Sequence, residues 1–136
     1  MQKFISDIPR GYNTAVSVKT ENNRKQISIE RSVGYPGVNY RQGDYTYDYI
    51  MNSLNEAQID YAVMKVPCCN EWLSLDMCRL FNDGMAKYSK MSNGRLIGLA
   101  IVPPWGTKAA MDELDRCINE LGMKSVQLCA HYGDLY

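Results

Sequence analysis

Residues 94–106 read GRLIGLAIVPPWG, an apolar run that stops abruptly at Pro103, Pro104 and Trp105. Its apolar part, residues 95–102, has the length and flanking residues of a buried strand. Proline cannot donate a hydrogen bond to a sheet ladder, so Pro103 and Pro104 end this strand. The sequence therefore places Trp105 just beyond the strand's carboxyl end.

Helices and strands alternate on both sides of this stretch. Helical spacing of apolar residues predicts three helices, and short apolar runs predict three strands. The helices cover residues 47–58, 74–91 and 107–121, and the strands cover residues 60–66, 95–102 and 124–130. Apolar strands separated by crossover helices are typical of a parallel sheet covered by helices, so the predicted fold class is α/β.

The two longer helices have the clearest expected features. Thr107 is the expected N-cap of the last helix and Gly122 its C-terminal stop. The residues expected to face the core are Met77, Leu80, Phe81 and Tyr88 on the first of the two, and Met111, Leu114, Ile118 and Leu121 on the second. The carboxylates expected to form a solvated face are Asp112, Glu113, Asp115 and Glu120.

The N-terminal part of the chain has a different pattern. Residues 14–19 and 26–31 alternate apolar and polar side chains, and the polar ENNRK between them is typical of a turn. This predicts a β-hairpin over residues 14–31. The Tyr- and Gly-rich residues 32–49 keep no period and are expected to form a long loop.

Composition limits the class of protein. The chain has 136 residues with 15 Lys plus Arg against 15 Asp plus Glu, which suits a single domain without the clustered basic surface that nucleic acids require. No apolar run approaches the roughly 20 residues of a membrane span, and the N-terminus lacks the apolar core of a signal peptide. We therefore expect a cytoplasmic protein with no membrane and no nucleic-acid partner.

The five cysteines fit that compartment. They are odd in number and do not form a disulfide framework, and their spacing does not match a zinc site. A nucleophilic Cys68 or Cys69 paired with His131 is conceivable, but no third orienting group is evident. There is also no glycine-rich nucleotide-binding motif.

Unusual side chains gather where the three predicted strands end. Residues 66–72 read VPCCNEW and residues 129–134 read CAHYGD, in addition to the Pro103–Trp105 stretch. Parallel strands present their carboxyl ends along one edge, which is where α/β folds bind ligands. Trp72 and Trp105 either line a ligand site there or cover an apolar rim by packing alone.

Residues 78–131 resemble the amidohydrolase-related family of aminocarboxymuconate-semialdehyde decarboxylase-like, metal-dependent hydrolases and decarboxylases. Four motifs of that family follow one another in order. They are a C-x-L-x-N-D helix start at Cys78, Leu80, Asn82 and Asp83, the strand and loop from Gly94 to Pro103, the E-L-x-R-C helix from Glu113 to Cys117, and the segment from Glu120 to Gln127. The likeness extends over about residues 40–134 and leaves out residues 14–31, which look like an insertion.

The resemblance implies a (β/α)8 TIM barrel with a divalent metal, usually zinc, at its carboxyl mouth. It also implies decarboxylation or hydrolysis of a small carboxylated ring compound or its ring-opened product. The chain departs from the family at the metal, because its one histidine, His131, does not match a family ligand. About three strands in 136 residues also fall short of the roughly 250 residues of a closed barrel.

We therefore expect residues 1–136 to be a fragment of one barrel domain, with β/α repeats over residues 46–134. No catalytic residue, metal ligand or bound cofactor is expected in this chain alone; the full-length enzyme is a possible homo-oligomer. By resemblance or position, the residues that would contact a small-molecule substrate are Arg41, Trp72, Trp105 and His131. Arg41 would grip a carboxylate, although a solvated surface arginine fits equally well. The alternative is a non-catalytic α/β binding module derived from the family.

Overall fold

A computed structural model describes residues 15–30, 38–66 and 73–129 of the chain. The chain divides into two compact units, with the boundary between Ile59 and Asp60. The single domain expected over residues 1–136 stays a prediction. Among the described residues, no helix is both long and apolar enough to cross a membrane.

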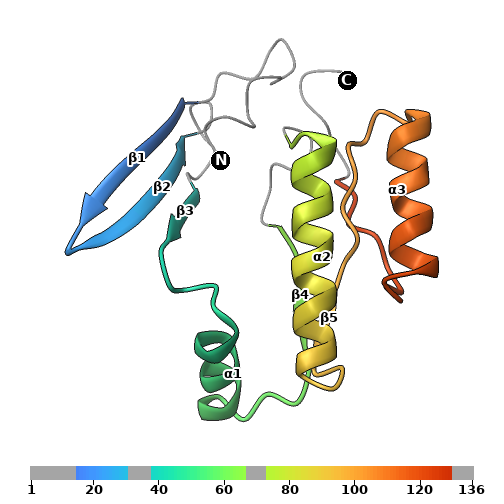
Figure 1. Ribbon diagram of the computed structural model, residues 1–136. Helices are drawn as coiled ribbons and strands as arrows, with labels where there is room; N and C mark the ends of the chain where they lie inside the picture. Colours follow the sequence, from blue (N-terminus) through green and yellow to red (C-terminus); the bar gives the residue numbers. More distant parts are fainter. Residues whose placement is uncertain (1–14, 31–37, 67–72, 130–136) are drawn as a thin grey trace. The chain divides into compact units, whose positions relative to one another are not determined.

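The N-terminal unit contains an antiparallel sheet in the order β1-β2-β3 (Figure 1). Strand β1 (Ala15–Glu21) pairs with β2 (Arg24–Glu30) across a two-residue turn. The turn residues Asn22 and Asn23 have φ of 50° and 60°, which suits a primed hairpin turn and the asparagines that tolerate it. The predicted hairpin is therefore confirmed in its described part.

The third strand of this sheet was not expected. β3 (Val38–Arg41) pairs antiparallel with β2, in the Tyr- and Gly-rich stretch that the sequence assigns to a loop. A strand of four residues is too short to show a lasting alternating pattern. The pairing comes from the open edge of β2, which a sequence pattern does not reveal.

Helix α1 (Tyr47–Glu56) follows in the same unit and confirms the helix expected there. The Thr46 hydroxyl donates to the Gly43 carbonyl at 3.0 Å instead of capping the helix. Gln58, with a φ of 55°, turns the chain away after the helix. Leu54 is the buried residue of this helix.

The C-terminal unit follows the order β4 (Ala62–Met64), α2 (Leu75–Met91), β5 (Leu96–Gly98) and α3 (Lys108–Asn119) (Figure 1). β4 and β5 pair in parallel, as predicted. The expected third strand is reduced to a parallel bridge between Ala100 and Val126. Thr107 caps α3 by accepting from the Ala110 amide at 3.3 Å, and Gly122 follows with a φ of 70°.

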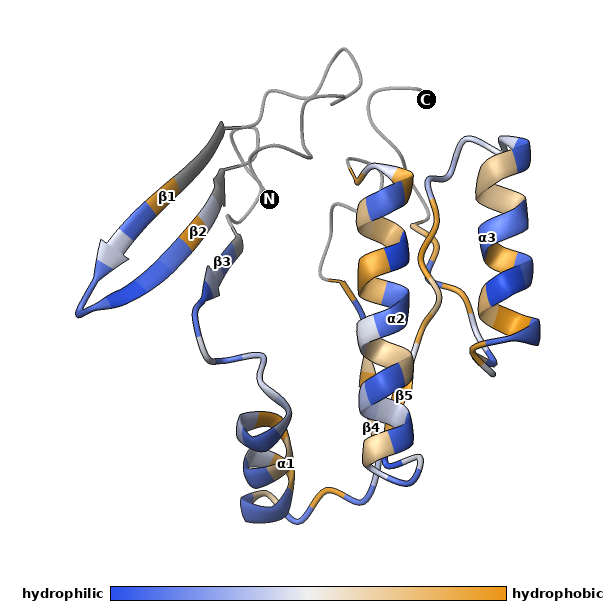
Figure 2. Ribbon diagram, in the orientation of Figure 1, coloured by the Kyte–Doolittle hydropathy of each residue, from blue (hydrophilic) through white to orange (hydrophobic). Residues whose placement is uncertain are grey.

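The core of this unit lies between the parallel strands and the helices. Leu96 and Ile101 are fully buried, together with the thiols Cys78 and Cys117. Apolar and polar residues alternate along both helices in Figure 2. The expected core positions are confirmed in part, because Met77 is buried and Phe81, Leu114 and Leu121 pack against the core. The apolar residues predicted for the core that are instead exposed are Leu80 at 61%, Met111 at 50% and Ile118 at 43%.

The architecture is therefore mixed α/β, with two small sheets and three helices in the described residues. The predicted α/β class holds for the C-terminal unit. These residues show no closed barrel, so the (β/α)8 barrel remains an expectation from resemblance. A parallel pair with crossover helices is compatible with part of one.

Candidate functional site

The carboxyl ends of the parallel strands form the candidate site. Beyond β4 the chain reaches Val66, and beyond β5 it runs through Ile101 and Val102, all three buried. Val126 lies beside Ala100, which is linked to the same segment by the Ala100 amide donating to the Ser125 carbonyl at 2.8 Å. These ends lie at one edge because the strands are parallel.

Gln127 links two of these strand ends through its side chain. Its backbone amide donates to the Ala100 carbonyl at 2.8 Å, as in a ladder. Its side-chain Nε2 donates to the Val66 carbonyl at 2.6 Å, and its Oε1 accepts from the Val66 amide at 3.0 Å. The carboxamide thus pairs with the backbone of Val66 as a neighbouring strand would.

Asn82 of α2 pairs in the same two-point way with the chain beyond β5. Its Oδ1 accepts from the Ile101 amide at 2.9 Å, and its Nδ2 donates to the Ile101 carbonyl at 2.9 Å. The same Nδ2 donates to Oε1 of Glu113 at 2.8 Å. Asn82 is fully buried, and its polar atoms all find partners, which makes the burial tolerable.

Glu113 of α3 contradicts the expectation of a solvated carboxylate, since it is only 1% exposed. Arg116 holds it with Nε to Oε2 at 2.8 Å and Nη2 to Oε1 at 2.9 Å, and Arg79 adds a bond from Nε at 3.3 Å. Burying a carboxylate is affordable only with such partners. The expectation held for the rest of that set: Asp112 pairs with Lys108 at the surface, and Asp115 and Glu120 are exposed.

The ionisation of this cluster follows from its contacts. Burial acts to raise the pKa of Glu113, but hydrogen bonds from Arg116, Asn82 and Cys117 outweigh it and lower the pKa to about 2. The hydrogen bond to Glu113 raises the pKa of Arg116 above its ordinary value. Burial, followed by the nearby Glu113 charge, raises the pKa of both Cys78 and Cys117 to about 12. Neither thiol suits nucleophilic chemistry, because the thiolate is the reactive form.

Trp105 lies where the sequence places it, after the half-buried Pro103 and Pro104, and is 45% exposed. Trp72 and His131 lie outside the described residues, as do Cys68 and Cys69. Of the four predicted contact residues, only Trp105 and Arg41 are therefore described, and they belong to different compact units.

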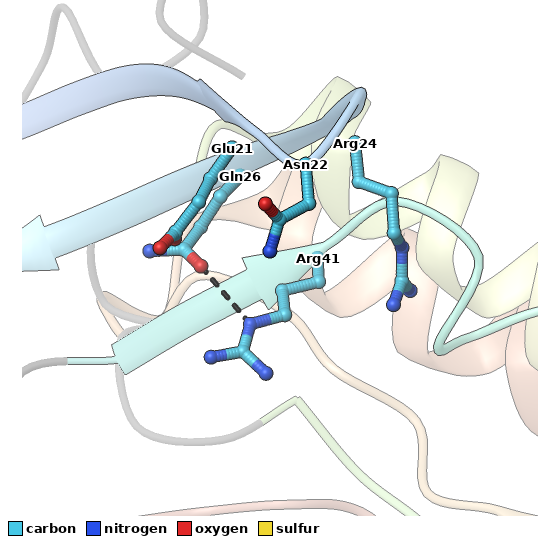
Figure 3. A pocket seen from close by; sticks show the side chains of 5 residues that line it. All are labelled: Glu21, Asn22, Arg24, Gln26 and Arg41. Carbon is cyan, nitrogen blue, oxygen red and sulfur yellow. Dashed lines mark hydrogen bonds between the residues drawn. The ribbon is translucent and has the colours of Figure 1, made fainter.

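Arg41 lies at the end of β3 and is exposed. Its Nε donates to Oε1 of Gln26 at 3.0 Å, and it lines an open hollow of about 150 Å³ with Glu21, Asn22 and Arg24 (Figure 3). Within the described part of the chain, no other hydrogen bond engages its guanidinium. Arg24 is instead held by Asp44 and the Gln42 carbonyl. Arg41 can therefore offer two nitrogens to an anion. The carboxylate of Glu21 lines the same hollow and would repel that anion.

The described residues offer no metal centre. In the ranges 15–30, 38–66 and 73–129, no three His, Cys, Asp or Glu side chains group closely enough to hold a metal ion. The described residues therefore do not fit the metal that the resemblance implies.

Sequence reasoning did not identify Asn82, Glu113 or Gln127 as the polar centres of the fold, although all three belong to the motifs that carry the resemblance. One signal was available for Asn82. Asparagine is a poor helix interior residue, so its place in the middle of α2 required a specific partner. For Gln127, a polar residue between the apolar Val126 and Leu128 gave a weaker indication.

Comparison with known proteins gives one distant likeness, and no family model matches the chain. The chain is 32% identical over 87 residues to the 2-amino-3-carboxymuconate-6-semialdehyde decarboxylase of Dictyostelium discoideum. The match covers 60% of this chain and 24% of that protein. The chain thus spans about a quarter of this relative's length, and the likeness supports a distant amidohydrolase-like relationship.

Proposed function

We propose that this chain supplies β/α units to an amidohydrolase-type enzyme that decarboxylates or hydrolyses a small carboxylated compound. The observation that carries the proposal is the parallel β4–β5 pair with its crossover helix, in the region that resembles a decarboxylase. By analogy with that relative, a carboxylated, ring-opened compound such as 2-amino-3-carboxymuconate-6-semialdehyde is the first substrate to test.

In this proposal the chain is a fragment that has no activity by itself. The remaining units of the barrel supply the catalytic residues and the ligands of a divalent metal, with zinc as the first candidate. Such a metal supplies Lewis-acid activation of a carbonyl or of water. The proposed partners are the small-molecule substrate and, for the complete enzyme, a second copy of itself.

The residues of this chain contribute binding in the proposal. Trp105 presents an exposed aromatic surface at the carboxyl edge. The free nitrogens of Arg41 are suited to a planar carboxylate, which a guanidinium grips in bidentate fashion. Trp72 and His131 are proposed as further contacts by their position in the sequence.

The first test is to translate the gene on both sides of residues 1–136. The proposal expects a His-x-His or Glu-x-His pair before this stretch, and a further His and an Asp after it. The complete gene product, loaded with zinc, is then assayed for CO2 release from the muconate semialdehyde and from carboxylated aromatic compounds. Flanking sequence without these ligands, or a metal-loaded product inert toward the whole panel, would rule the proposal out.

A matched pair of variants tests the binding role of Arg41. Arg41→Ala is expected to raise KM with little change in kcat, because it removes a contact made equally in ground and transition states. Lys19→Ala, at an exposed position of the same sheet, serves as the control and should leave both constants unchanged. If Arg41→Ala keeps the wild-type KM, Arg41 does not bind the substrate and is a solvated surface residue.

A second candidate function is a non-catalytic α/β binding module. It is favoured by the C-terminal unit having a contiguous core of its own, in which Cys78, Ala100, Ile101 and Cys117 are fully buried. A module of this kind would unfold cooperatively as a monomer without further barrel units.

A further inference from the structure

The backbone ladder between β4 and β5 stops before the strands reach the carboxyl edge. Their register pairs Ala62 with Leu96 and Met64 with Gly98, so its continuation would bring Val66 beside Ala100. Instead, both polar groups of Val66 are paired with the side chain of Gln127. A side-chain amide therefore takes the place of a strand at this point.

The end of β5 is held in the same way but from the other side. Both polar groups of Ile101 pair with the carboxamide of Asn82, on helix α2. Asn82 is in turn fixed by Glu113 of α3, which Arg116 grips through two nitrogens. Ile101 is thus tied through α2 to α3, and both N–H groups of the Asn82 Nδ2 are engaged, one by the Ile101 carbonyl and one by Glu113.

We infer that Gln127 and Asn82 are positioning residues that fix where the chain leaves β4 and β5 at the carboxyl edge. Each carboxamide has one N–H on the same side as its carbonyl oxygen, unlike a trans peptide group, so it can donate to and accept from one backbone residue at two points. A single hydrogen bond would leave that residue free to rotate about the contact.

The position set at Ile101 is transmitted to Trp105. Only Val102, Pro103 and Pro104 separate the two residues, and proline restricts both its own φ and the conformation of the residue before it. The two hydrogen bonds between Asn82 and Ile101, here called a clamp, thus restrict where the backbone places Trp105. This inference deepens the proposed function and rests on it, because that edge is where the proposed substrate binds.

The clamps also account for two motif residues that the proposed chemistry does not use. Asn82 is the asparagine of the C-x-L-x-N-D helix start in the first motif, and Gln127 ends the last one. Their structural partners are backbone atoms of strand ends, not a ligand. The motifs on which the family resemblance rests thus include residues that shape the edge of the sheet.

Amide hydrogen exchange, resolved residue by residue by NMR, tests the Gln127 clamp. In Gln127→Met, which keeps the side-chain length but removes both hydrogen bonds, the Val66 amide is expected to exchange about 5- to 30-fold faster relative to the Ala100 amide. Ala100 donates to the Ser125 backbone, so it reports general loosening of the sheet. Ser125→Ala, at an exposed position of the same segment, is the control and should leave the ratio unchanged.

The Asn82 clamp is tested without a variant, because Asn82→Ala would leave Glu113 short of a partner and could fail to fold. In the wild-type chain, a through-hydrogen-bond scalar coupling is expected between the Ile101 amide nitrogen and the Asn82 side-chain carbonyl carbon, and likewise between Val66 and Gln127. An unchanged Val66 to Ala100 exchange ratio in Gln127→Met, or the absence of both couplings, overturns the inference.

These readouts do not depend on catalysis. If the ratio and couplings behave as expected while the complete gene product releases no CO2, the clamps stand and the proposed function fails. If the gene product is active and the exchange ratio is unchanged, the proposed function stands and the clamps fail. A variant that loosened the whole unit would accelerate Val66 and Ala100 together, which also counts against the inference.

Discussion

Glu113 places a buried negative charge between helices α2 and α3. Two arginines, one asparagine and one thiol surround it: Arg79, Arg116, Asn82 and Cys117. A carboxylate at this depth is stable only as long as these partners stay in place. Its contribution to folding should therefore depend on pH in a way that distinguishes it from the surface carboxylates of the same helix.

The pKa of Glu113 is lowered from 4.5 to about 2, so its stabilisation is complete above pH 4.5 and is lost as the pH falls toward 2. The shift corresponds to a stabilisation on the order of 3 kcal/mol. Urea unfolding at pH 7, 4.5, 3 and 2 should show wild type more stable than Glu113→Gln at pH 7, with the difference shrinking between pH 4.5 and 2. Asp115→Asn, exposed on the same helix, should follow the wild-type profile; a pH-independent difference for Glu113→Gln would contradict the assignment.

Cys78 and Cys117 give a second residue-scale prediction. Both thiols are fully buried, and their pKa of about 12, raised by burial and then by the Glu113 charge, keeps them protonated at neutral pH. Iodoacetamide at pH 8 should leave both unmodified in the folded chain and modify both in urea, as mapped by mass spectrometry of peptides. Rapid alkylation of either thiol in the folded chain would show that this interface opens.

At the scale of elements, the close approach of α2 to β5 depends on Gly98. A Cβ at this position would lie 2.9 Å from the Met85 Cβ and 3.4 Å from the Met123 Cε. Gly98→Ala is therefore expected to destabilise the unit by about 1–3 kcal/mol through overpacking. Chemical denaturation of the wild type and the variant measures this difference.

Gly84 offers the matched control for that prediction. It lies within α2, is exposed, and a Cβ there would meet no atom within 4 Å. Gly84→Ala should raise the free energy of unfolding by about 0.5–1 kcal/mol, because alanine is the better helix former. The two glycine variants should therefore move stability in opposite directions, and a loss in both would mean that the Gly98 effect is not one of packing.

The helices could be predicted from sequence because their signals are local. Thr107 was expected as an N-cap, and its side chain accepts the Ala110 amide. Ser74 caps α2 in the same way through the Met77 amide. The buried side of each helix could be predicted only in part. Counting large apolar residues identified Met77 correctly but also favoured the exposed Leu80, Met111 and Ile118. It missed small and polar residues that are buried, such as Ala110 and Asn82. Close packing of helices on a sheet and paired polar groups are tertiary effects that a one-dimensional pattern does not record.

At the scale of the whole molecule, the strand order in the C-terminal unit followed from sequence, and the extent of pairing did not. Residues 124–130 are predicted as a strand, but within the described residues 124–129 only Val126 forms a bridge. The Gln127 side chain there contacts Val66, a long-range contact that sequence does not show. Similarly, β3 forms because an edge of β2 is available, a long-range condition. For the candidate site, the position of Trp105 could be predicted from Pro103 and Pro104. The clamps at Val66 and Ile101 could not, because they join residues far apart in sequence.

One face of the parallel sheet in the C-terminal unit carries exposed apolar side chains. Val63 and Ile97 pair in register and are 59% and 37% exposed, and Tyr61, two residues before Val63, is 70% exposed. Parallel sheets almost always have both faces covered, so apolar side chains exposed on one face indicate that something is missing from it. This observation favours the proposal of further barrel units over a self-sufficient module.

The last prediction follows from that surface. The 136-residue chain alone should bind an apolar dye such as ANS and self-associate in sedimentation velocity, because Val63 and Ile97 remain in water. The double variant Val63→Thr with Ile97→Thr keeps β-branched residues in the strands and should reduce both dye binding and self-association. Leu80→Gln, which removes an equally exposed apolar residue from helix α2, is the control and should change neither. If the unmodified chain is instead monomeric, unfolds cooperatively and binds no dye, the face needs no cover, and the non-catalytic module becomes the better account of the protein.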